Sequence, residues 1–164
     1  MLQQLSLGET FSSPRLHPIN INQLIDEALQ LSAHQAHNKH INLLKQWTEI
    51  LWINADSTQI LRVLNNLLCN ALRATPEGGT IQITLTKKNN GASISVSDTG
   101  SGISKRNLDS IFDPGFTTKT DGKGGLGMAI SYLNIEAHGG ELTVAQDQPQ
   151  GLIVTIWLPL SLQQ

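Results

Sequence analysis

An aspartate that ends a strand-like stretch and is followed by glycines is the first feature of this sequence that could do chemistry. Asp98 closes the alternating stretch 92–97, and Gly100 and Gly102 come shortly after it. A carboxylate can accept a hydrogen bond from an exocyclic amine, and glycines allow the backbone to approach a flat ring closely. On these residues alone, a tight turn and a pocket for a ring such as adenine fit equally well.

A second set of polar residues is spaced to lie on one face of a helix that begins at Asp56. The apolar face comprises Ile60, Leu64, Leu67, Leu68 and Ala71, and the opposite face carries Gln59, Arg62, Asn66, Asn70 and Arg73. The amide oxygen of Asn70 suits a hard cation such as Mg²⁺, and Arg73 could reach a phosphate. The alternative is a solvated face. Asparagine is a poor helix former, so Asn66 and Asn70 favour a polar site.

The third candidate is the glycine-rich segment 117–130, TTKTDGKGGLGMAI. Glycines that lead into a helix leave backbone N–H groups available to a phosphate, and the helix dipole favours the anion. Lys119 and Lys123 add positive charge. A flexible loop is the alternative reading. The spacing matches neither the P-loop nor the Rossmann glycine pattern, so those two nucleotide sites are excluded.

Hydrophobic periodicity predicts the elements that must position these residues. Asn20 or Asn22 caps the first helix, and Asp56 with Gln59 resembles a capping box at the start of the second. Helices are expected over 21–39, 56–74, 104–112 and 126–138, and strands over 41–47, 51–53, 80–88, 92–97, 141–146 and 151–159. This order predicts an α+β fold with helices over one face of a mostly antiparallel sheet. The polar start of the chain, through Pro18, predicts little order.

Composition narrows the function classes. The 164 residues fit one domain, and the formal charge of -2 without basic runs argues against nucleic-acid binding. No stretch is long and apolar enough for a membrane span or a signal core. The single cysteine, Cys69, excludes a disulfide framework and suits a reducing compartment. We therefore expect a cytoplasmic domain with no direct membrane contact.

Four stretches in order resemble the N, G1, F and G2 boxes of the catalytic ATP-binding domain of sensor histidine kinases: NNLLCNALRATPEGGTI, DTGSGIS, IFDPGFTTK and GKGGLGMAI. This domain belongs to the GHKL superfamily, which also includes Hsp90, gyrase B and MutL. The resemblance covers roughly Pro14 to Pro159. It implies the two-layer α/β sandwich called the Bergerat fold, with a mixed, mostly antiparallel sheet and about three helices on one face.

The resemblance also implies roles for particular residues, with ATP and Mg²⁺ as cofactors. Asn70 would hold Mg²⁺, Asn66 and Arg73 would lie beside the phosphates as catalytic residues, and Asp98 would take the adenine amine. Gly100 and Gly102 would shape the pocket. A lid anchored by Phe112 and Phe116 would contribute the remaining cofactor-binding residues: Lys119, Gly122, Lys123, Gly124, Gly125, Leu126 and Gly127.

Three departures from the family pattern qualify this assignment. Hsp90-like ATPases carry a water-activating glutamate where this chain has Asn66, so transfer to an acceptor is favoured over hydrolysis. Ala74 stands where many histidine kinases have an aromatic residue. The GxGxG pattern fits only in a shifted register, through Gly122, Gly124 and Gly125 or through Gly125 and Gly127.

The acceptor histidine of the family lies in an upstream helical dimerisation domain, and His17 lacks that helical setting. Residues 1–13 are therefore interpreted as the tail of that domain or a linker, and residues 14–164 as the catalytic domain. The expected partners are the upstream phosphoacceptor domain and a response regulator, and the intact kinase can be membrane-anchored. Two alternatives stay open: a nucleotide-binding interaction module (a degenerate kinase) and a GHKL serine kinase or ATPase. A metal site at His34, His37 and His40 is a minor alternative.

Overall fold

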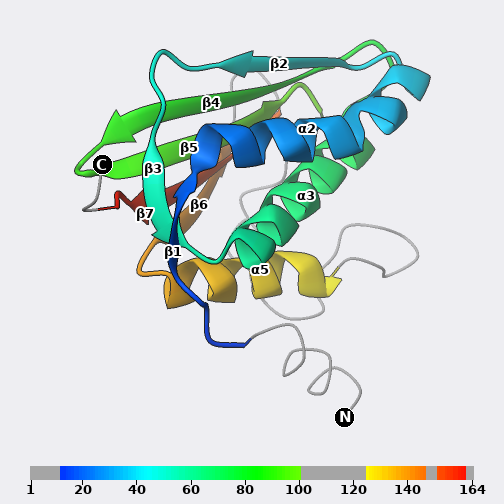
Figure 1. The fold of residues 1–164 in the computed structure, drawn as a ribbon. Helices are drawn as coiled ribbons and strands as arrows, with labels where there is room; N and C mark the ends of the chain where they lie inside the picture. Colours follow the sequence, from blue (N-terminus) through cyan, green and yellow to red (C-terminus); the bar gives the residue numbers. More distant parts are fainter. Residues whose placement is uncertain (1–11, 101–124, 147–150, 162–164) are drawn as a thin grey trace.

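The computed structural model describes residues 12–100, 125–146 and 151–161. Within them, a five-stranded sheet forms one layer, and three helices cover one of its faces (Figure 1). The helices are α2 (Ile21–Asn38), α3 (Ser57–Ala74) and α5 (Gly125–Ala137). The expected two-layer α+β architecture is confirmed. The expected short helix 104–112 and the turn 147–150 lie outside the described residues.

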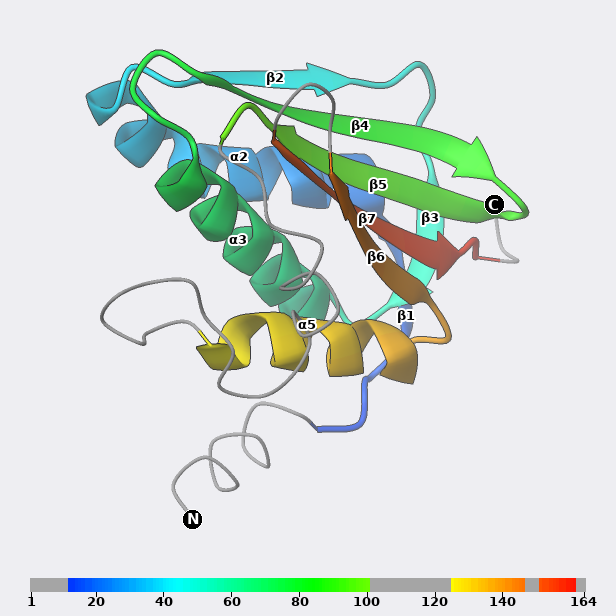
Figure 2. The same ribbon diagram turned by 180° about the vertical axis from the view of Figure 1, so that it is seen from behind.

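The sheet has the strand order β2-β4-β5-β7-β6, which Figure 2 shows from behind. Its strands are β2 (Asn42–Gln46), β4 (Thr80–Lys88), β5 (Gly91–Asp98), β6 (Glu141–Gln146) and β7 (Leu152–Pro159). Only β2 with β4 is a parallel pair; the other neighbours are antiparallel. The sheet is thus mixed and mostly antiparallel, as the resemblance implies.

The β4–β5 hairpin sets the position of Asp98. Its turn consists of Asn89 and Asn90, which both have positive φ (52° and 59°), as a two-residue type I′ turn requires. The register that follows pairs Ile81 with Asp98 at the far end of the hairpin. Because this two-residue turn admits only one register, it fixes which residue of β5 ends beside α3.

The inner face of the sheet packs against α3 and forms the core. Alternate residues of β4, β5 and β7 are buried because side chains alternate between the two faces of a strand. On the helix side, the predicted apolar face of α3 is buried as expected. The fully or almost fully buried side chains of this contact include Ile60, Leu64, Leu67, Leu68, Ile81, Ile83, Ile94 and Ile156.

The start of α3 departs from a complete capping box. Asp56 caps the helix as predicted, since its Oδ1 accepts from the Gln59 N–H at 3.2 Å. The Gln59 side chain does not reach back to Asp56. It is buried, and its Nε2 donates to the carbonyl oxygen of Ser12 at 2.9 Å. The assignment of Gln59 to the open polar face was therefore wrong: the chain that enters the domain covers it.

The partner of the Asp56 N–H is instead His138, the residue that follows α5. His138 Nε2 accepts from this N–H at 3.1 Å, and His138 Nδ1 lies 2.6 Å from the carbonyl oxygen of Asn134. A carbonyl can only accept and a backbone N–H can only donate, so the ring carries its proton on Nδ1. His138 follows α5 as predicted, but it is buried, and it joins the end of α5 to the start of α3.

The first described residues are more ordered than their composition predicts. Strand β1 (His17–Asn20) pairs antiparallel with β3 (Trp52–Ala55). Before it, the Arg15 N–H donates to Asp56 Oδ2 at 3.0 Å. For residues 12–18 the expectation of little order was wrong, because pairing with β3 and contacts to α3 supply the order that the local sequence lacks; residues 1–11 lie outside the described part of the chain.

The choice between two N-caps for α2 is settled in favour of Asn20, whose Oδ1 accepts from the Gln23 N–H at 3.1 Å. Asn22 is buried, and its amide binds the Glu49 carbonyl and the Leu51 N–H, which holds the chain before β3.

None of the described helices has the length and apolar run that a membrane span needs. Within the same residues, no group of three His, Cys, Asp or Glu side chains could hold a metal ion.

Replacing Asp56 with asparagine tests the charge of the cap. Burial raises the pKa of this carboxyl, but hydrogen bonds from the backbone N–H groups of Arg15, Gln59 and Thr58 outweigh burial and hold the pKa below its ordinary value. Such a group stabilises the fold above its unfolded pKa, and the contribution is lost as the pH falls through the folded pKa. The free energy of unfolding should therefore fall more steeply for wild type than for Asp56→Asn as the pH drops below about 4.

Urea denaturation at a series of pH values measures this difference. Asp56→Ser, a second uncharged cap, is the control and should follow Asp56→Asn. Parallel pH profiles for wild type and both variants would contradict the assigned role of the carboxylate.

Candidate functional site

The described site lies along the side of α3 that faces away from the core. Asn66 and Asn70 are half-buried there, and Arg73 is exposed at the last turn. The Arg73 guanidinium donates to Asn70 Oδ1. The predicted helical spacing thus brings these three side chains to one side of the helix, although Gln59, predicted to share that side, lies buried at its start.

Asp98 reaches the same end of α3 from the sheet. It is 4% exposed, and its Oδ1 accepts from the Gly100 N–H at 2.8 Å, which fixes the orientation of the carboxylate. A Cβ on Gly100 would lie 2.4 Å from the Ala74 carbonyl oxygen, and one on Gly151 would lie 2.0 Å from the Asp98 carbonyl oxygen. Glycines at these two positions therefore allow the strand end, the last turn of α3 and the start of β7 to approach closely.

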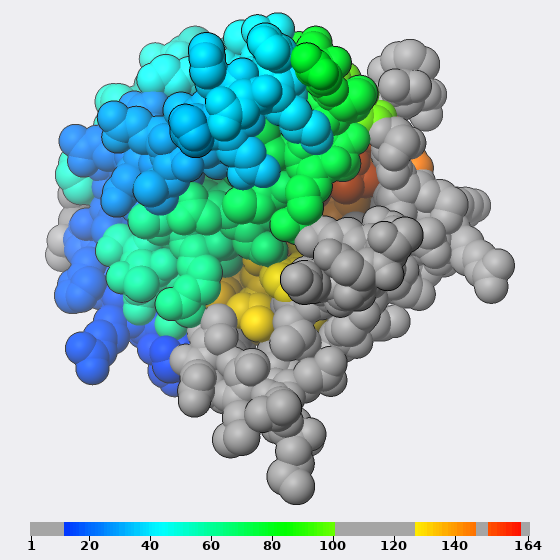
Figure 3. Space-filling model, turned by 90° about the vertical axis from the view of Figure 1, so that its right-hand side faces the viewer, coloured from blue at the N-terminus to red at the C-terminus, as the bar shows by residue number. Residues whose placement is uncertain are grey.

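The start of α5 meets the middle of α3. A Cβ on Gly127 would lie 2.5 Å from Asn66 Oδ1. One turn further along α5, the buried Ser131 hydroxyl accepts from Asn66 Nδ2 at 3.0 Å. Figure 3 shows the side of the molecule on which α3 (green) and α5 (yellow) lie against one another. Asp98 at the end of β5 and Gly127 at the start of α5 therefore both lie beside α3, the helix that carries Asn66 and Asn70.

Sequence reasoning missed Ser131 and the bond that His138 makes. Their partners lie 65 and 82 residues away along the chain. Helical periodicity places both on the inner face of α5, at the same phase as Gly127, but it does not indicate which helix they meet.

Several predicted residues lie outside the described part of the chain, namely Gly102, Phe112, Phe116, Lys119, Gly122, Lys123 and Gly124. Gly125 and Leu126 begin α5. The choice between the two glycine registers therefore remains open, although Gly127 lies next to Asn66.

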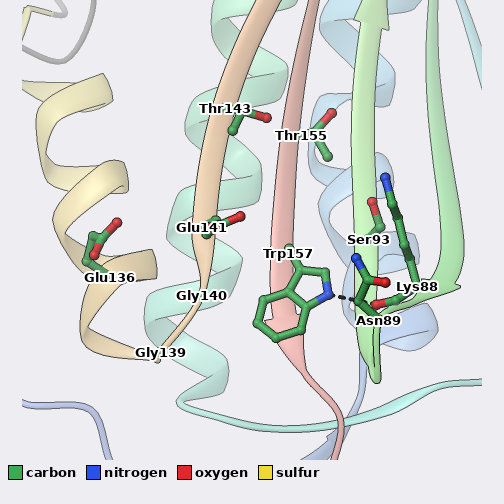
Figure 4. A pocket seen from close by; sticks show the side chains of 10 residues that line it. All are labelled: Lys88, Asn89, Ser93, Glu136, Gly139, Gly140, Glu141, Thr143, Thr155 and Trp157. Atoms are coloured by element: carbon green, nitrogen blue, oxygen red, sulfur yellow. Dashed lines mark hydrogen bonds between the residues drawn. The ribbon is translucent and has the colours of Figure 1, made fainter.

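A separate open hollow of about 770 Å³ lies where the outer face of the sheet meets the end of α5 (Figure 4). It is lined by residues such as Ser93, Thr155 and Trp157, whose indole N–H donates to the Lys88 carbonyl at 2.8 Å. It contains none of the predicted site residues. Size alone is a poor guide here, because the chemistry predicted from the sequence gathers around α3 instead.

Comparison with known proteins agrees with this geometry. A sequence model of the family described as histidine kinase-, DNA gyrase B-, and HSP90-like ATPases matches residues 55–162. The chain belongs to this family. The match includes α3, the end of β5 and α5, so the family membership expected from the four motifs is confirmed.

Two curated relatives of this chain are named as kinases. Sensor histidine kinase ZraS of Escherichia coli K12 is 38% identical over 148 residues, which cover 90% of this chain and 32% of ZraS. Sporulation kinase A of Bacillus subtilis 168 is 32% identical over 142 residues, which cover 86% of this chain and 23% of that kinase. The chain thus spans a third or less of the length of these relatives.

Solved structures show the same fold. The catalytic domain of histidine kinase ThkA has a TM-score of 0.81 and 33% identity, with 88% of this chain and 95% of that domain covered. Full-length ShkA in complex with AMPPNP has a TM-score of 0.83 and 28% identity, with 98% and 34% covered. The resemblance to a histidine kinase catalytic domain therefore holds for both sequence and fold.

Replacing Gly127 with alanine tests the close approach of α3 and α5. In a helix interior, alanine is more favourable than glycine by about 1 kcal/mol, so any net loss of stability must come from the clash with Asn66. We expect Gly127→Ala to lower the free energy of unfolding by about 1–3 kcal/mol. The double variant Asn66→Ala/Gly127→Ala should recover most of this loss.

Chemical denaturation of the four proteins in this cycle gives the coupling energy, with Asn66→Ala as the matched control. Additive effects would show that the two residues do not touch in solution.

Proposed function

We propose that this domain binds ATP with Mg²⁺ and transfers the γ-phosphoryl group to a histidine on a separate helical dimerisation domain. The proposal is supported mainly by one observation: residues from the end of β5 and from the start of α5 both lie against α3. Gly100 brings the Asp98 carboxylate against the last turn of this helix, and Gly127 brings the start of α5 against Asn66. An acceptor for an exocyclic amine and a set of amide oxygens and cations thus lie along one helix.

Asp98 would recognise the adenine. The Gly100 N–H donates to one oxygen of this carboxylate and holds the group in one orientation. A carboxylate has about four lone-pair sites, so it can still accept from an amine. Gly102 would line the same pocket beside the ring.

Asn70 fits a Mg²⁺ role. Its Oδ1 is a hard neutral oxygen that already accepts from a cation, the Arg73 guanidinium. One protein oxygen is enough for Mg²⁺, because this ion usually takes water molecules and phosphate oxygens as its other ligands. When bound, the metal would neutralise phosphate charge. Arg73, released from Asn70, would contact a phosphate directly, and Lys119, Lys123 and the glycines up to Gly127 would cover the phosphates.

The reaction itself needs little covalent help from the domain. The bond from the γ-phosphorus to the β–γ bridging oxygen breaks, a P–N bond forms to the imidazole, and ADP leaves. The imidazole N–H proton passes to a base on the acceptor domain or to water. Positioning and charge neutralisation are the main requirements, and amide, cation and backbone N–H groups supply them. Asn66 stands where Hsp90-like ATPases have a water-activating glutamate, and an amide is not a general base, which favours transfer over hydrolysis.

The proposed partners follow from the same reaction. Histidine kinase ThkA has been solved in complex with response regulator protein TrrA, and that structure matches 90% of this chain with a TM-score of 0.79. We propose that a response regulator receives the phosphoryl group from the phosphohistidine. We place the domain in the cytoplasm, where ATP is available.

Purified domain, a phosphoacceptor helical domain of a sensor histidine kinase and γ-labelled ATP test the proposal. We expect an acid-labile label on the helical domain. Asp98→Asn should weaken ATP binding by about 10- to 100-fold, because the amide is neutral and has one acceptor oxygen, which the Gly100 N–H already engages, where the carboxylate has two. Asn70→Ala should abolish the dependence of ATP binding on Mg²⁺.

Asp26→Asn is the matched control, because Asp26 lies exposed on α2 beside Lys45. It should bind ATP as wild type does. Nucleotide binding without any label would favour the interaction module, and an acid-stable label would favour a serine-directed kinase. Wild-type affinity in Asp98→Asn would refute the adenine pocket.

A further inference from the structure

Asn66 is held by a residue that none of the sequence motifs singles out. Its Nδ2 donates to Ser131 Oγ at 3.0 Å. Ser131 is 2% exposed, and it lies one helical turn beyond Gly127 on the same face of α5. The serine end of the bond is therefore buried, and loss of the bond there leaves a buried polar group without this partner.

The same contact determines which atom Asn66 presents to the first turn of α5. With Nδ2 bound to Ser131, the atom nearest to the position of a Gly127 Cβ is Asn66 Oδ1, at 2.5 Å. The amide is thus enclosed by Ser131 on one side and by the Gly127 backbone on the other. An amide oxygen cannot bond to phosphate oxygens, because both are acceptors. It can accept from water molecules or from an N–H group of a bound partner.

We propose that Ser131 is a positioning residue for the transfer reaction. It holds the Asn66 side chain against α5 with its oxygen directed at the first turn, so that Asn66 acts as an acceptor at the phosphate end of the site. The catalytic consequence rests on the proposed function; the orientation of Asn66 does not. Loss of a group that orients a site residue typically costs about 10- to 100-fold in activity.

The orientation is tested without nucleotide. In ¹⁵N NMR spectra, the side-chain amide protons of Asn66 should exchange slowly with water in the wild-type protein. In Ser131→Ala they should exchange faster and shift toward the values of exposed asparagines. Ser32→Ala is the matched control, because Ser32 is a buried serine on α2 and should leave the Asn66 signals unchanged. Unchanged Asn66 signals in Ser131→Ala would overturn the proposal.

The catalytic consequence is tested by phosphotransfer to the helical acceptor domain. Ser131→Ala should lower the transfer rate by about 10- to 100-fold with little change in ATP affinity, whereas Ser131→Thr, which keeps the hydroxyl, should retain most of the rate. Thermal unfolding of each variant shows whether it is folded. A merely structural role would change stability in Ser131→Ala and Ser32→Ala alike and would leave the rate per folded molecule unchanged.

A double-mutant cycle separates positioning by Ser131 from an independent effect. If Ser131 acts through Asn66, Asn66→Ala/Ser131→Ala should transfer at the same rate as Asn66→Ala alone. Additive losses would overturn the proposal. A wild-type domain that binds ATP but never labels the acceptor would instead refute the proposed function, and the NMR result would still decide whether Ser131 orients Asn66.

Discussion

Asn66 and Gly127 lie so close that no side-chain carbon fits between α3 and α5 at this point. The rest of the site depends on this approach, because it sets the distance between the helix that carries the asparagines and the helix that follows the glycine segment. At the other end of the contact, His138 bonds to the Asp56 N–H and keeps the two helices together over several turns. Helix α5 is thus fixed to α3 near both of its own ends, at Gly127 and at His138.

The end of α3 is fixed as firmly as its start. The Lys39 ammonium group donates to the Leu72 carbonyl at 2.6 Å, and the Thr75 hydroxyl donates to the Ala71 carbonyl at 2.7 Å. The Lys39 bond gives a partner to a carbonyl of the last turn, and the Thr75 hydroxyl adds to the bond that the Thr75 N–H donates to the Ala71 carbonyl at 2.9 Å. A helix held at its start, its middle and its end presents its side chains from a rigid support, which a binding site needs if its ligands are to stay in register.

Most of the fold could be predicted from the sequence because its signals are local. The residues Asn89 and Asn90 do not by themselves settle the type of turn, yet the alternating strands on either side identify the hairpin. Asp56 marks the start of α3 correctly. The failures were non-local: β1 contains Pro18 and acquires its order from pairing with β3, and Gln59 is buried by a chain segment that precedes it by 47 residues.

The site was likewise predicted where its signals are local and missed where they depend on distant residues. The types and spacing of Asn66, Asn70 and Asp98 are enough to indicate their chemistry, and the fold brings them to a single helix. The sequence could not indicate the residue that orients Asn66 or the residue that holds the start of α3, because Ser131 and His138 look like ordinary helix residues until the partner helix is placed beside them.

The enclosure of Asn66 also bears on how this family can diverge. Asn66 lies against Gly127 on one side and donates a hydrogen bond to Ser131 on the other, so both the length of this side chain and its N–H group matter. A water-activating glutamate at this position would be longer and would lack the N–H donor that Ser131 binds. A glutamate could therefore replace Asn66 in this chain only together with a compensating substitution on α5.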